Sequence, residues 1–339
     1  MKLDAFATSL DLATAGDAAA SFERAGYHGL WLAETQFDPF LPLAVATTRT
    51  TTLRLGTAIA VAFPRSPMVT AMDAWALQRT SGGRLDLGLG TQVRAHIERR
   101  FSSTYDRPAA RMREYVLALR HIWGAFQHEH PLRFKGDFYQ FSLLTPFFDP
   151  GPIEHPRVNV LVAAVNARMF TVAGEVADGA VAHPFHTATY LRDVALPALR
   201  RGLKKAGRDR ASFSVVSPAF TLVRGSDSYA EDERYVRQQL AFYASTPTYR
   251  PVLTAHGWDS VGEELSALAS RGRFDDLARV VTDAMMDAFV TYGRDYADLA
   301  RSMRERYAGL LDRIGLYGGA ASRPSADEVT TIARVLAER

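Results

Sequence analysis

Side chains that could do acid–base chemistry lie where predicted strands end. The apolar run 29–33 is followed at once by Glu34, Thr35 and Gln36, which place a carboxylate, a hydroxyl and an amide together. A helix cap would use the same residue types. Acidic groups at the carboxyl end of a parallel strand, however, are also where acid–base chemistry is found. We therefore predict that Glu34 is an acid–base group and that the hydroxyl of Thr35 orients a substrate by hydrogen bonding.

Two more predicted strand ends have the features of an anion site. The run 84–89 leads into a loop, 88–92, whose glycines suit open backbone N–H groups. The run 158–163 leads into Ala164, Val165, Asn166 and Ala167, where the next helix is expected to begin. Unpaired N–H groups and the positive end of the helix dipole would suit a phosphate. Every helix start shares this property, so the residues alone indicate an anion site only in general terms.

The predicted third strand, 53–62, is long and ends in small residues before Pro64. Small side chains would let a flat ring approach the backbone closely. They would serve equally well to fill the interior of a barrel. The pattern leaves both interpretations open.

Several kinds of chemistry have no matching motif. The chain has no cysteine, which excludes disulfides, thiolate metal sites and cysteine nucleophiles. It also has no Walker phosphate loop, no nucleophile elbow and no H-E-x-x-H zinc motif. The nearest dinucleotide fingerprint, 88–93, has Val93 where a third glycine is needed. The segment 128–130, His-Glu-His, lies at a predicted helix end before a proline, and the histidines of 183–186 lack a carboxylate at ligand spacing, so no metal site is expected.

The pattern of elements predicts an α/β fold. Short apolar runs alternate with segments of helical period, as in repeated βα units with a parallel sheet. Eight such units suggest a (β/α)8 TIM barrel, with a doubly wound open sheet as the alternative. The predicted strands are 2–8, 29–33, 53–62, 84–89, 158–163, 178–182, 213–223 and 313–317.

Three stretches depart from the plain repeat. An aromatic insertion, 131–157, follows the fourth helix, and its core is predicted to form a hairpin turning at Lys135-Gly136-Asp137. A largely helical insertion, 249–306, precedes the eighth strand. After a single domain, 1–320, the tail 321–339 holds Ser325 and Glu328 at capping-box spacing, which predicts a final helix.

Composition indicates a globular, water-soluble class. Of 339 residues, 47% are apolar and 23% charged, and the formal net charge of +3 is spread along the chain. Nothing in this distribution indicates nucleic-acid binding. The sequence has neither a membrane span nor a signal peptide, so a cytoplasmic location is expected.

Long segments of the chain resemble the bacterial luciferase-like superfamily of TIM barrels, in particular its deazaflavin (coenzyme F420) dependent oxidoreductases. The most specific pair of motifs is S-G-G-R-x-x-L-G-L-G at 81–90 and A-G-E-V-A-D-G at 173–179. The resemblance extends over 26–44, 53–101 and 158–185, and more weakly over 312–319. It implies a closed barrel and a homodimer. The helix faces 40–45 and 68–77 are apolar candidates for the dimer contact.

The resemblance also implies roles for the matching positions. Ala58, Ile59 and Ala60 correspond to a bulge, often with a non-proline cis peptide, that supports the deazaflavin ring. The segment from Ala164 through Val165 and Asn166 to Ala167 corresponds to the cradle of the coenzyme phosphate. Gly90, Thr91 and Gln92 match cofactor-contacting positions, and His183 would lie beside the ring as a second orienting group. Arg94, Arg99 and Arg100 could attract the acidic tail of the coenzyme.

One departure from the family bears on the reaction. Relatives that oxidise alcohols or sugar hydroxyls carry an Asp-His pair where this sequence has Glu34-Thr35, and a threonine hydroxyl cannot act as a base near neutral pH. We predict an F420-dependent oxidoreductase that transfers a hydride to or from a small organic substrate, with segment 134–148 as a substrate lid. An FMN-dependent monooxygenase and a non-catalytic flavin-binding barrel are the alternatives.

Overall fold

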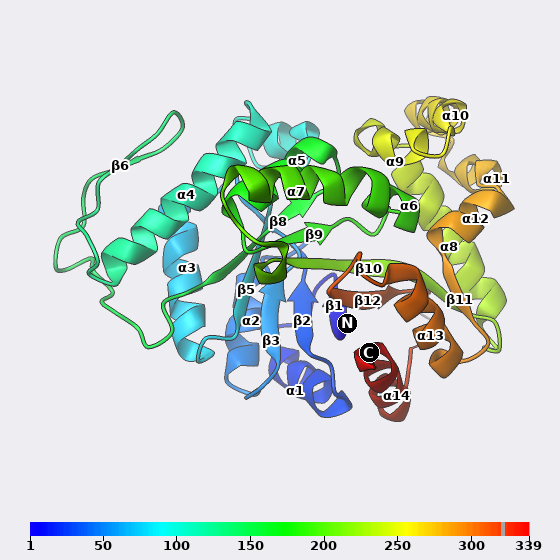
Figure 1. The fold of residues 1–339 in the computed structure, drawn as a ribbon, viewed down its shortest axis with the longest axis horizontal. Helices are drawn as coiled ribbons and strands as arrows, with labels where there is room; N and C mark the ends of the chain where they lie inside the picture. Colours follow the sequence, from blue (N-terminus) through cyan, green and yellow to red (C-terminus); the bar gives the residue numbers. More distant parts are fainter. Residues whose placement is uncertain (320–322, 339) are drawn as a thin grey trace.

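In the computed structural model, which describes residues 1–319 and 323–338, eight parallel strands form the centre of the molecule (Figure 1). Each predicted apolar run overlaps one of them. In the order in which they are joined, the strands are β1 (Lys2–Ala7), β2 (Gly29–Leu32), β3 (Arg54–Thr57), β5 (Leu85–Gly90), β8 (Asn159–Ala164), β9 (Gly179–Ala182), β10 (Ser214–Val223) and β12 (Arg313–Tyr317).

The sheet is closed. Strand β12 pairs with β1, where Lys2 lies opposite Arg313, and it also pairs with β10, where Val216 lies opposite the same arginine. All these pairings are parallel, and no edge remains between the first and last strands. The prediction of a (β/α)8 barrel is therefore confirmed over the open-sheet alternative.

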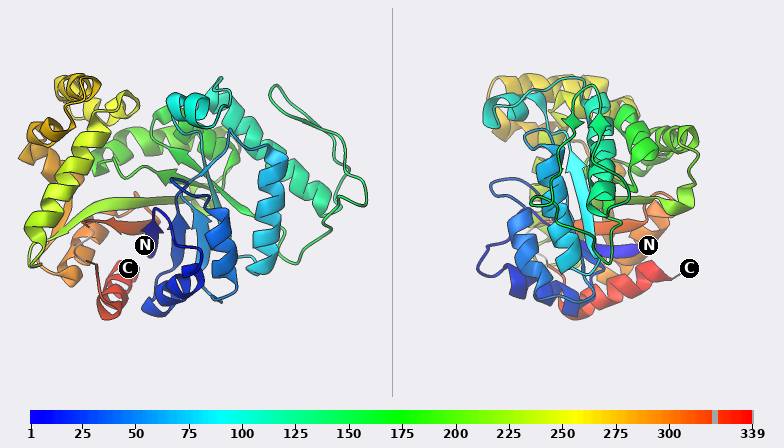
Figure 2. Two further views of the ribbon diagram at one scale, coloured as in Figure 1. Left: turned by 180° about the vertical axis from the view of Figure 1, so that it is seen from behind. Right: turned by 90° about the vertical axis from the view of Figure 1, so that its left-hand side faces the viewer.

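Helices surround the barrel (Figures 1 and 2). Those up to β10 are α1 (Ala15–Ala25), α2 (Phe40–Thr47), α3 (Pro67–Thr80), α4 (Pro108–Phe126), α5 (Ala167–Val176), α6 (Ala188–Tyr190) and α7 (Leu196–Lys205). Two π-helical turns, η1 (His96–Arg100) and η2 (Leu191–Ala195), follow β5 and α6. Helix α1 is capped by Gly26, whose φ of 94° is the left-handed conformation that glycine adopts readily at the end of a helix.

The segment between β10 and β12 is largely helical, as predicted. Its elements are α8 (Tyr229–Ala244), α9 (Arg250–Thr254), α10 (Asp259–Ser270), α11 (Leu277–Val280), α12 (Asp283–Phe289), β11 (Thr291–Gly293) and α13 (Tyr296–Tyr307). Strand β11, which the sequence analysis does not predict, adds to β10 in parallel. Helix α14 (Ala326–Ala337) begins with the predicted capping box of Ser325 and Glu328. Of the predicted tail and domain boundary, residues 320–322 and 339 lie outside the described residues.

The aromatic insertion forms the predicted hairpin. Strands β6 (Phe134–Lys135) and β7 (Gln140–Phe141) pair in antiparallel register. The carboxylate of Glu114 on α4 accepts N–H bonds from Asp137, Phe138 and Tyr139, at 2.7–2.8 Å. These bonds hold the hairpin against α4, at the periphery of the molecule (Figure 1).

Aromatic packing fills the barrel interior below the carboxyl ends of the strands. Trp31 is fully buried, and its ring stacks on Phe6 with centroids 6.0 Å apart. A Cβ on Gly56 would lie 2.5 Å from the Trp31 ring, so only glycine leaves room for it. At the opposite end from the pocket described below, Arg313 lies between two buried carboxylates, Asp4 and Asp86.

Candidate active site

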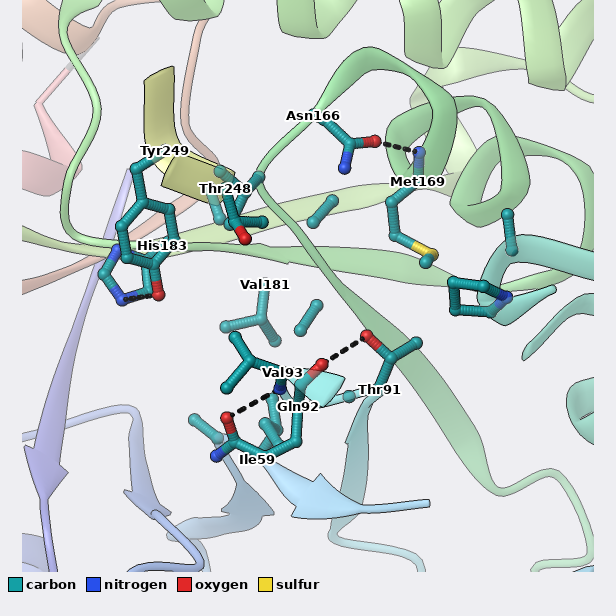
Figure 3. A pocket seen from close by; sticks show the side chains of 18 of the residues that line it. Ile59, Thr91, Gln92, Val93, Asn166, Met169, Val181, His183, Thr248 and Tyr249 are labelled. Carbon is teal, nitrogen blue, oxygen red and sulfur yellow. Dashed lines mark hydrogen bonds between the residues drawn. The ribbon is translucent and has the colours of Figure 1, made fainter. Parts of the chain in front are cut away.

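A pocket of about 580 Å³ lies at the carboxyl ends of β3, β5, β8 and β9 (Figure 3). Its wall is mainly apolar, including Phe6, Val181, Pro184 and Met169. This is the end of a TIM barrel where active sites form. Of the predicted site residues, Ala58, Ile59, Gly90, Thr91, Gln92, Ala164, Val165, Asn166 and His183 line the pocket.

A bulge after β3 forms one side of the pocket. The peptide bond between Ala58 and Ile59 is cis, where the family resemblance implies such a bond. The Ala58 N–H donates to the carbonyl of Leu32 at 2.8 Å, and β4 (Ala60–Val61) follows at once. Ala58 and Ile59 line the pocket, whereas Ala60 is buried behind them. The bulge therefore presents backbone and an aliphatic side chain to whatever occupies the pocket.

The loop after β5 forms the neighbouring wall. A Cβ on Gly90 would lie 2.6 Å from the Ile59 side chain, so this glycine makes room for the bulge. Gln92 adopts a left-handed φ of 54°, and its side-chain oxygen accepts the Val93 N–H at 3.0 Å. The Thr91 hydroxyl donates to the Gln92 carbonyl at 3.1 Å (Figure 3). Both side chains are thus tied to their own loop.

The start of α5 lies across the pocket from the bulge. Asn166 caps this helix, and its side-chain oxygen accepts the Met169 N–H at 3.0 Å (Figure 3). The N–H groups of Ala167 and Arg168, in the first turn, have no partner in the part of the chain that the structure describes. The exposed Arg168 guanidinium, likewise unpaired among the described residues, also borders the pocket. This end of the pocket can bind an anion.

His183 and Tyr249 form a pair on the third side. Their rings stack with centroids 4.5 Å apart, and His183 Nε2 lies 3.2 Å from the Tyr249 hydroxyl (Figure 3). Burial lowers the pKa of His183 to about 3 and raises the pKa of Tyr249 to about 12, so both are neutral near pH 7. Tyr249 was missed by sequence analysis. It is the last residue of a short 3-10 turn, Pro247–Tyr249, and is 66 residues from His183 in the sequence.

Glu34 and Thr35 lie at the end of β2, as predicted, but neither lines the pocket. One oxygen of Glu34 accepts the Val61 N–H at 2.8 Å and a bond from Arg65 at 2.7 Å. The Thr35 hydroxyl donates to the carbonyl of Thr8 at 3.1 Å, and the Thr35 carbonyl accepts a bond from Arg100. The acid–base role of Glu34 and the orienting role of Thr35 stay predictions.

The aromatic insertion lies away from the pocket. None of residues 134–148 lines it. Phe147 and Phe148 instead border a separate hollow with Met72 and Trp75 of α3. The prediction of a substrate lid in this insertion is therefore wrong. Aromatic composition suggested a cover, but the bonds to Glu114 hold the hairpin on the outside of α4.

Within residues 1–319 and 323–338, no three His, Asp or Glu side chains gather in a way that could hold a metal ion. The same residues include no helix long and apolar enough to cross a membrane.

The closed barrel and the pocket at the carboxyl ends of its strands place the chain in the TIM-barrel class of proteins. The profile of the luciferase-like monooxygenase family matches residues 4–313, and the chain belongs to this family. The chain is also 46% identical over 304 residues to an uncharacterized protein of Mycobacterium tuberculosis, with 89% of each chain covered. The resemblance stated from the sequence is thereby confirmed.

Other similar proteins are oxidoreductases. The 5,10-methylenetetrahydromethanopterin reductase of Archaeoglobus fulgidus is 27% identical, covering 80% of this chain and 79% of the relative. Among solved structures, the coenzyme F420 dependent tetrahydromethanopterin reductase of Methanopyrus kandleri superposes with a TM-score of 0.78 at 19% identity, covering 99% and 98% of the two chains. An FMN complex of a Baeyer–Villiger monooxygenase from Pseudomonas putida gives a TM-score of 0.67 at 13% identity, covering 99% and 98%. The prediction of a luciferase-like oxidoreductase is confirmed at this level.

Proposed function

We propose that this protein binds coenzyme F420 and transfers a hydride between the coenzyme and a small organic substrate. The observation that carries the proposal is the pocket itself, in which a backbone bulge faces a helix start with two free N–H groups and Arg168. A flat ring fits against the bulge, and a phosphate fits the helix start. A bound deazaflavin would supply two-electron hydride transfer, and the protein would position it and exclude water.

The charges around the pocket support an anionic cofactor. Arg94 and Arg168 line it, and no Asp or Glu is among its lining residues. Arg94 is held by Glu98 at 2.7 Å and lies 5.1 Å from the centre of the Tyr105 ring. Arg168 is therefore the arginine better placed to meet a phosphate, while Arg99 and Arg100 follow on η1 outside the lining. The sequence similarity, at 28% identity, to a putative coenzyme F420-dependent oxidoreductase of Mycobacterium tuberculosis favours F420 over FMN.

Titration of the purified protein with oxidised F420 and, separately, with FMN tests the proposal. We expect F420 to bind at least about tenfold more tightly, a difference of about 1.4 kcal/mol. Binding is followed through the absorbance and fluorescence of each cofactor. Tighter binding of FMN would support the monooxygenase alternative, and binding of neither would refute a cofactor role for this pocket.

Asn166→Asp is expected to weaken F420 binding at least about fivefold, because charges ~4 Å apart repel by ~1–4 kcal/mol at a partly exposed site. Aspartate caps a helix as well as asparagine does, so the substitution changes charge and leaves the cap in place. Ser66→Asp, at the cap of α3 and outside the pocket, is the matched control and should leave the affinity unchanged. Unchanged affinity in Asn166→Asp would mean that the phosphate binds elsewhere.

We also propose that the protein is a homodimer. Helices α2 and α3 expose Leu41, Val69 and Met72, of which Leu41 is 60% exposed. Phe147 and Phe148 extend this apolar surface beside α3. Sedimentation at micromolar concentration is expected to give twice the chain mass, and Met72→Asp to shift the protein toward monomer because it places a charge on this surface. A monomeric mass for the wild type would count against the dimer.

A further inference from the structure

The pocket lacks an evident acid for the reaction proposed above. Hydride transfer to or from a carbon that bears oxygen requires a proton partner for that oxygen. No carboxylate lines the pocket, and Glu34 is engaged by Val61 and Arg65 behind the bulge. The ionisable lining side chains are Arg94, Tyr105, Arg168, His183 and Tyr249. An arginine does not give up its proton near neutral pH, which leaves the tyrosines and the histidine.

Hydrogen bonding fixes the tautomer of His183. The backbone N–H of Phe185 donates to Nδ1 at 3.1 Å, so Nδ1 is an acceptor and the proton of the neutral ring is on Nε2. The Nε2–H therefore donates to the hydroxyl oxygen of Tyr249, 3.2 Å away. With its oxygen already accepting this bond, Tyr249 has its own O–H proton free to donate into the pocket.

Packing holds this pair in place. Tyr243 meets the His183 ring edge-on with centroids 4.7 Å apart, and Phe185 lies 5.9 Å from Tyr249. The Tyr243 hydroxyl bonds that of Tyr317 at 2.9 Å and does not line the pocket. Figure 3 shows the Tyr249 hydroxyl beside His183, with Ile59 and Thr91 on other sides of the pocket. Tyr249 is thus preorganised to donate to a group bound in the pocket that it lines with the bulge.

We propose that Tyr249 is the proton donor to the substrate oxygen, that His183 is the residue that positions it, and that the substrate is an uncharged or anionic carbonyl compound. This inference rests on the proposed hydride transfer. In the reductive direction, a hydride from the reduced coenzyme forms a C–H bond at the carbonyl carbon. The C=O π pair moves to oxygen, which takes the Tyr249 proton and leaves an alcohol and the oxidised coenzyme. The phenolate accepts the His183 N–H bond and regains its proton from water.

The lining charges set the substrate class. Two arginines border the pocket and no carboxylate does, so a cationic substrate would lack a counter-charge. A neutral phenol is a hydrogen-bond donor at physiological pH and fits a carbonyl oxygen as its acceptor.

The test uses carbonyl-labelled cyclohexanone, a saturated ketone that can take a hydride only at its carbonyl carbon, as the probe on the full-length protein. F420 binding is measured first on wild type, Tyr249→Phe and Tyr243→Phe, and all three are expected to bind it equally. The infrared C=O band of the bound probe is then recorded with oxidised F420 present. We expect a shift to lower wavenumber in wild type and Tyr243→Phe that is lost in Tyr249→Phe. We also expect oxidation of reduced F420 by the probe to slow ~10²–10⁴-fold in Tyr249→Phe.

The F420 binding measurement tests the proposed function, and the infrared measurement tests the role of Tyr249. Failure of the wild type to bind F420 would refute the proposed function, and the inference with it. F420 binding with no band shift in wild type, or with an equal shift in Tyr249→Phe, would overturn the role of Tyr249 and leave the proposed function standing. Loss of the shift in Tyr243→Phe as well would assign it to packing of the aromatic cluster and also overturn the inference.

Discussion

Arg313→Met is expected to lower the free energy of unfolding by ~3–5 kcal/mol, because it removes one partner from a buried ionic network. The guanidinium bonds Asp4 at 2.7 Å and Asp86 at 2.6 Å, and all three side chains are nearly inaccessible to water. Asp86 would keep its bond from Arg54, but within the described part of the chain Asp4 would keep only the hydrogen bond from the indole N–H of Trp31. Urea unfolding followed by tryptophan fluorescence measures the loss.

Two further variants test the physical reason. Arg334→Met breaks an exposed pair with Glu338, 3.1 Å long, and should cost less than ~1 kcal/mol. The double change of Asp4→Asn with Arg313→Met removes both buried partners and should recover part of the stability. A loss below ~1 kcal/mol in Arg313→Met alone would show that the network contributes no more than a surface pair.

The same network predicts a pH dependence. Hydrogen bonds and charge from Arg54 and Arg313 outweigh burial and lower the pKa of Asp86 to about 2, from an ordinary value of 3.8. The stability that this group contributes is therefore complete above about pH 4 and lost as the pH falls through about 2. Burial raises the pKa of Asp4, whose contribution has the opposite sign. The difference in the free energy of unfolding between wild type and Arg313→Met is expected to become smaller from pH 4 toward pH 2. Urea unfolding across that pH range would measure it.

The strands could be predicted from local sequence because each is a short apolar run flanked by residues that are not part of the run. All eight strands lie within or close to their predicted runs, and the hairpin turn and the Ser325 capping box are also where expected. The sheet is closed by pairing between residues such as Lys2 and Arg313, which are more than 300 positions apart in the sequence. The local periodicity of apolar residues does not indicate such a pairing. The family resemblance, which depends on whole motifs, favoured closure.

Residues of the site were predictable only where a motif contained them. The bulge at Ala58 and Ile59 and the cap at Asn166 belong to such motifs. Tyr249 does not, because its place beside His183 depends on how a helical insertion folds back over the barrel. The partners of Glu34 are also set by tertiary contacts. Nothing in Glu34-Thr35-Gln36 indicates that Arg65 will bond the carboxylate.

Glu34→Gln is expected to lower stability and F420 affinity more than turnover. The backbone N–H of Glu34 donates to the Ile59 carbonyl at 3.1 Å, and its carboxylate accepts the Val61 N–H, so this residue bonds the bulge on both sides of Ala60. An amide loses the charge that strengthens the bonds to Val61 and Arg65, which is worth ~1–3 kcal/mol. A shifted bulge would then fit the coenzyme ring less well. Thermal unfolding and F420 titration measure these two effects.

The turnover of Glu34→Gln, measured with the coenzyme at saturation, shows which of two roles Glu34 has. It either holds the bulge in place or exchanges a proton with the substrate. If Glu34 acts only on the bulge, turnover stays within about tenfold of wild type, whereas loss of a general acid–base group costs ~10²–10⁴-fold. Asp38→Asn is the matched control, because Asp38 also pairs with Arg65 but bonds the Phe40 N–H instead of the bulge. It should lower stability and leave F420 affinity unchanged. A 10²-fold or greater fall in turnover for Glu34→Gln, with melting temperature and affinity as in wild type, would instead establish the acid–base role predicted from the sequence, since only proton transfer separates the two side chains in that case.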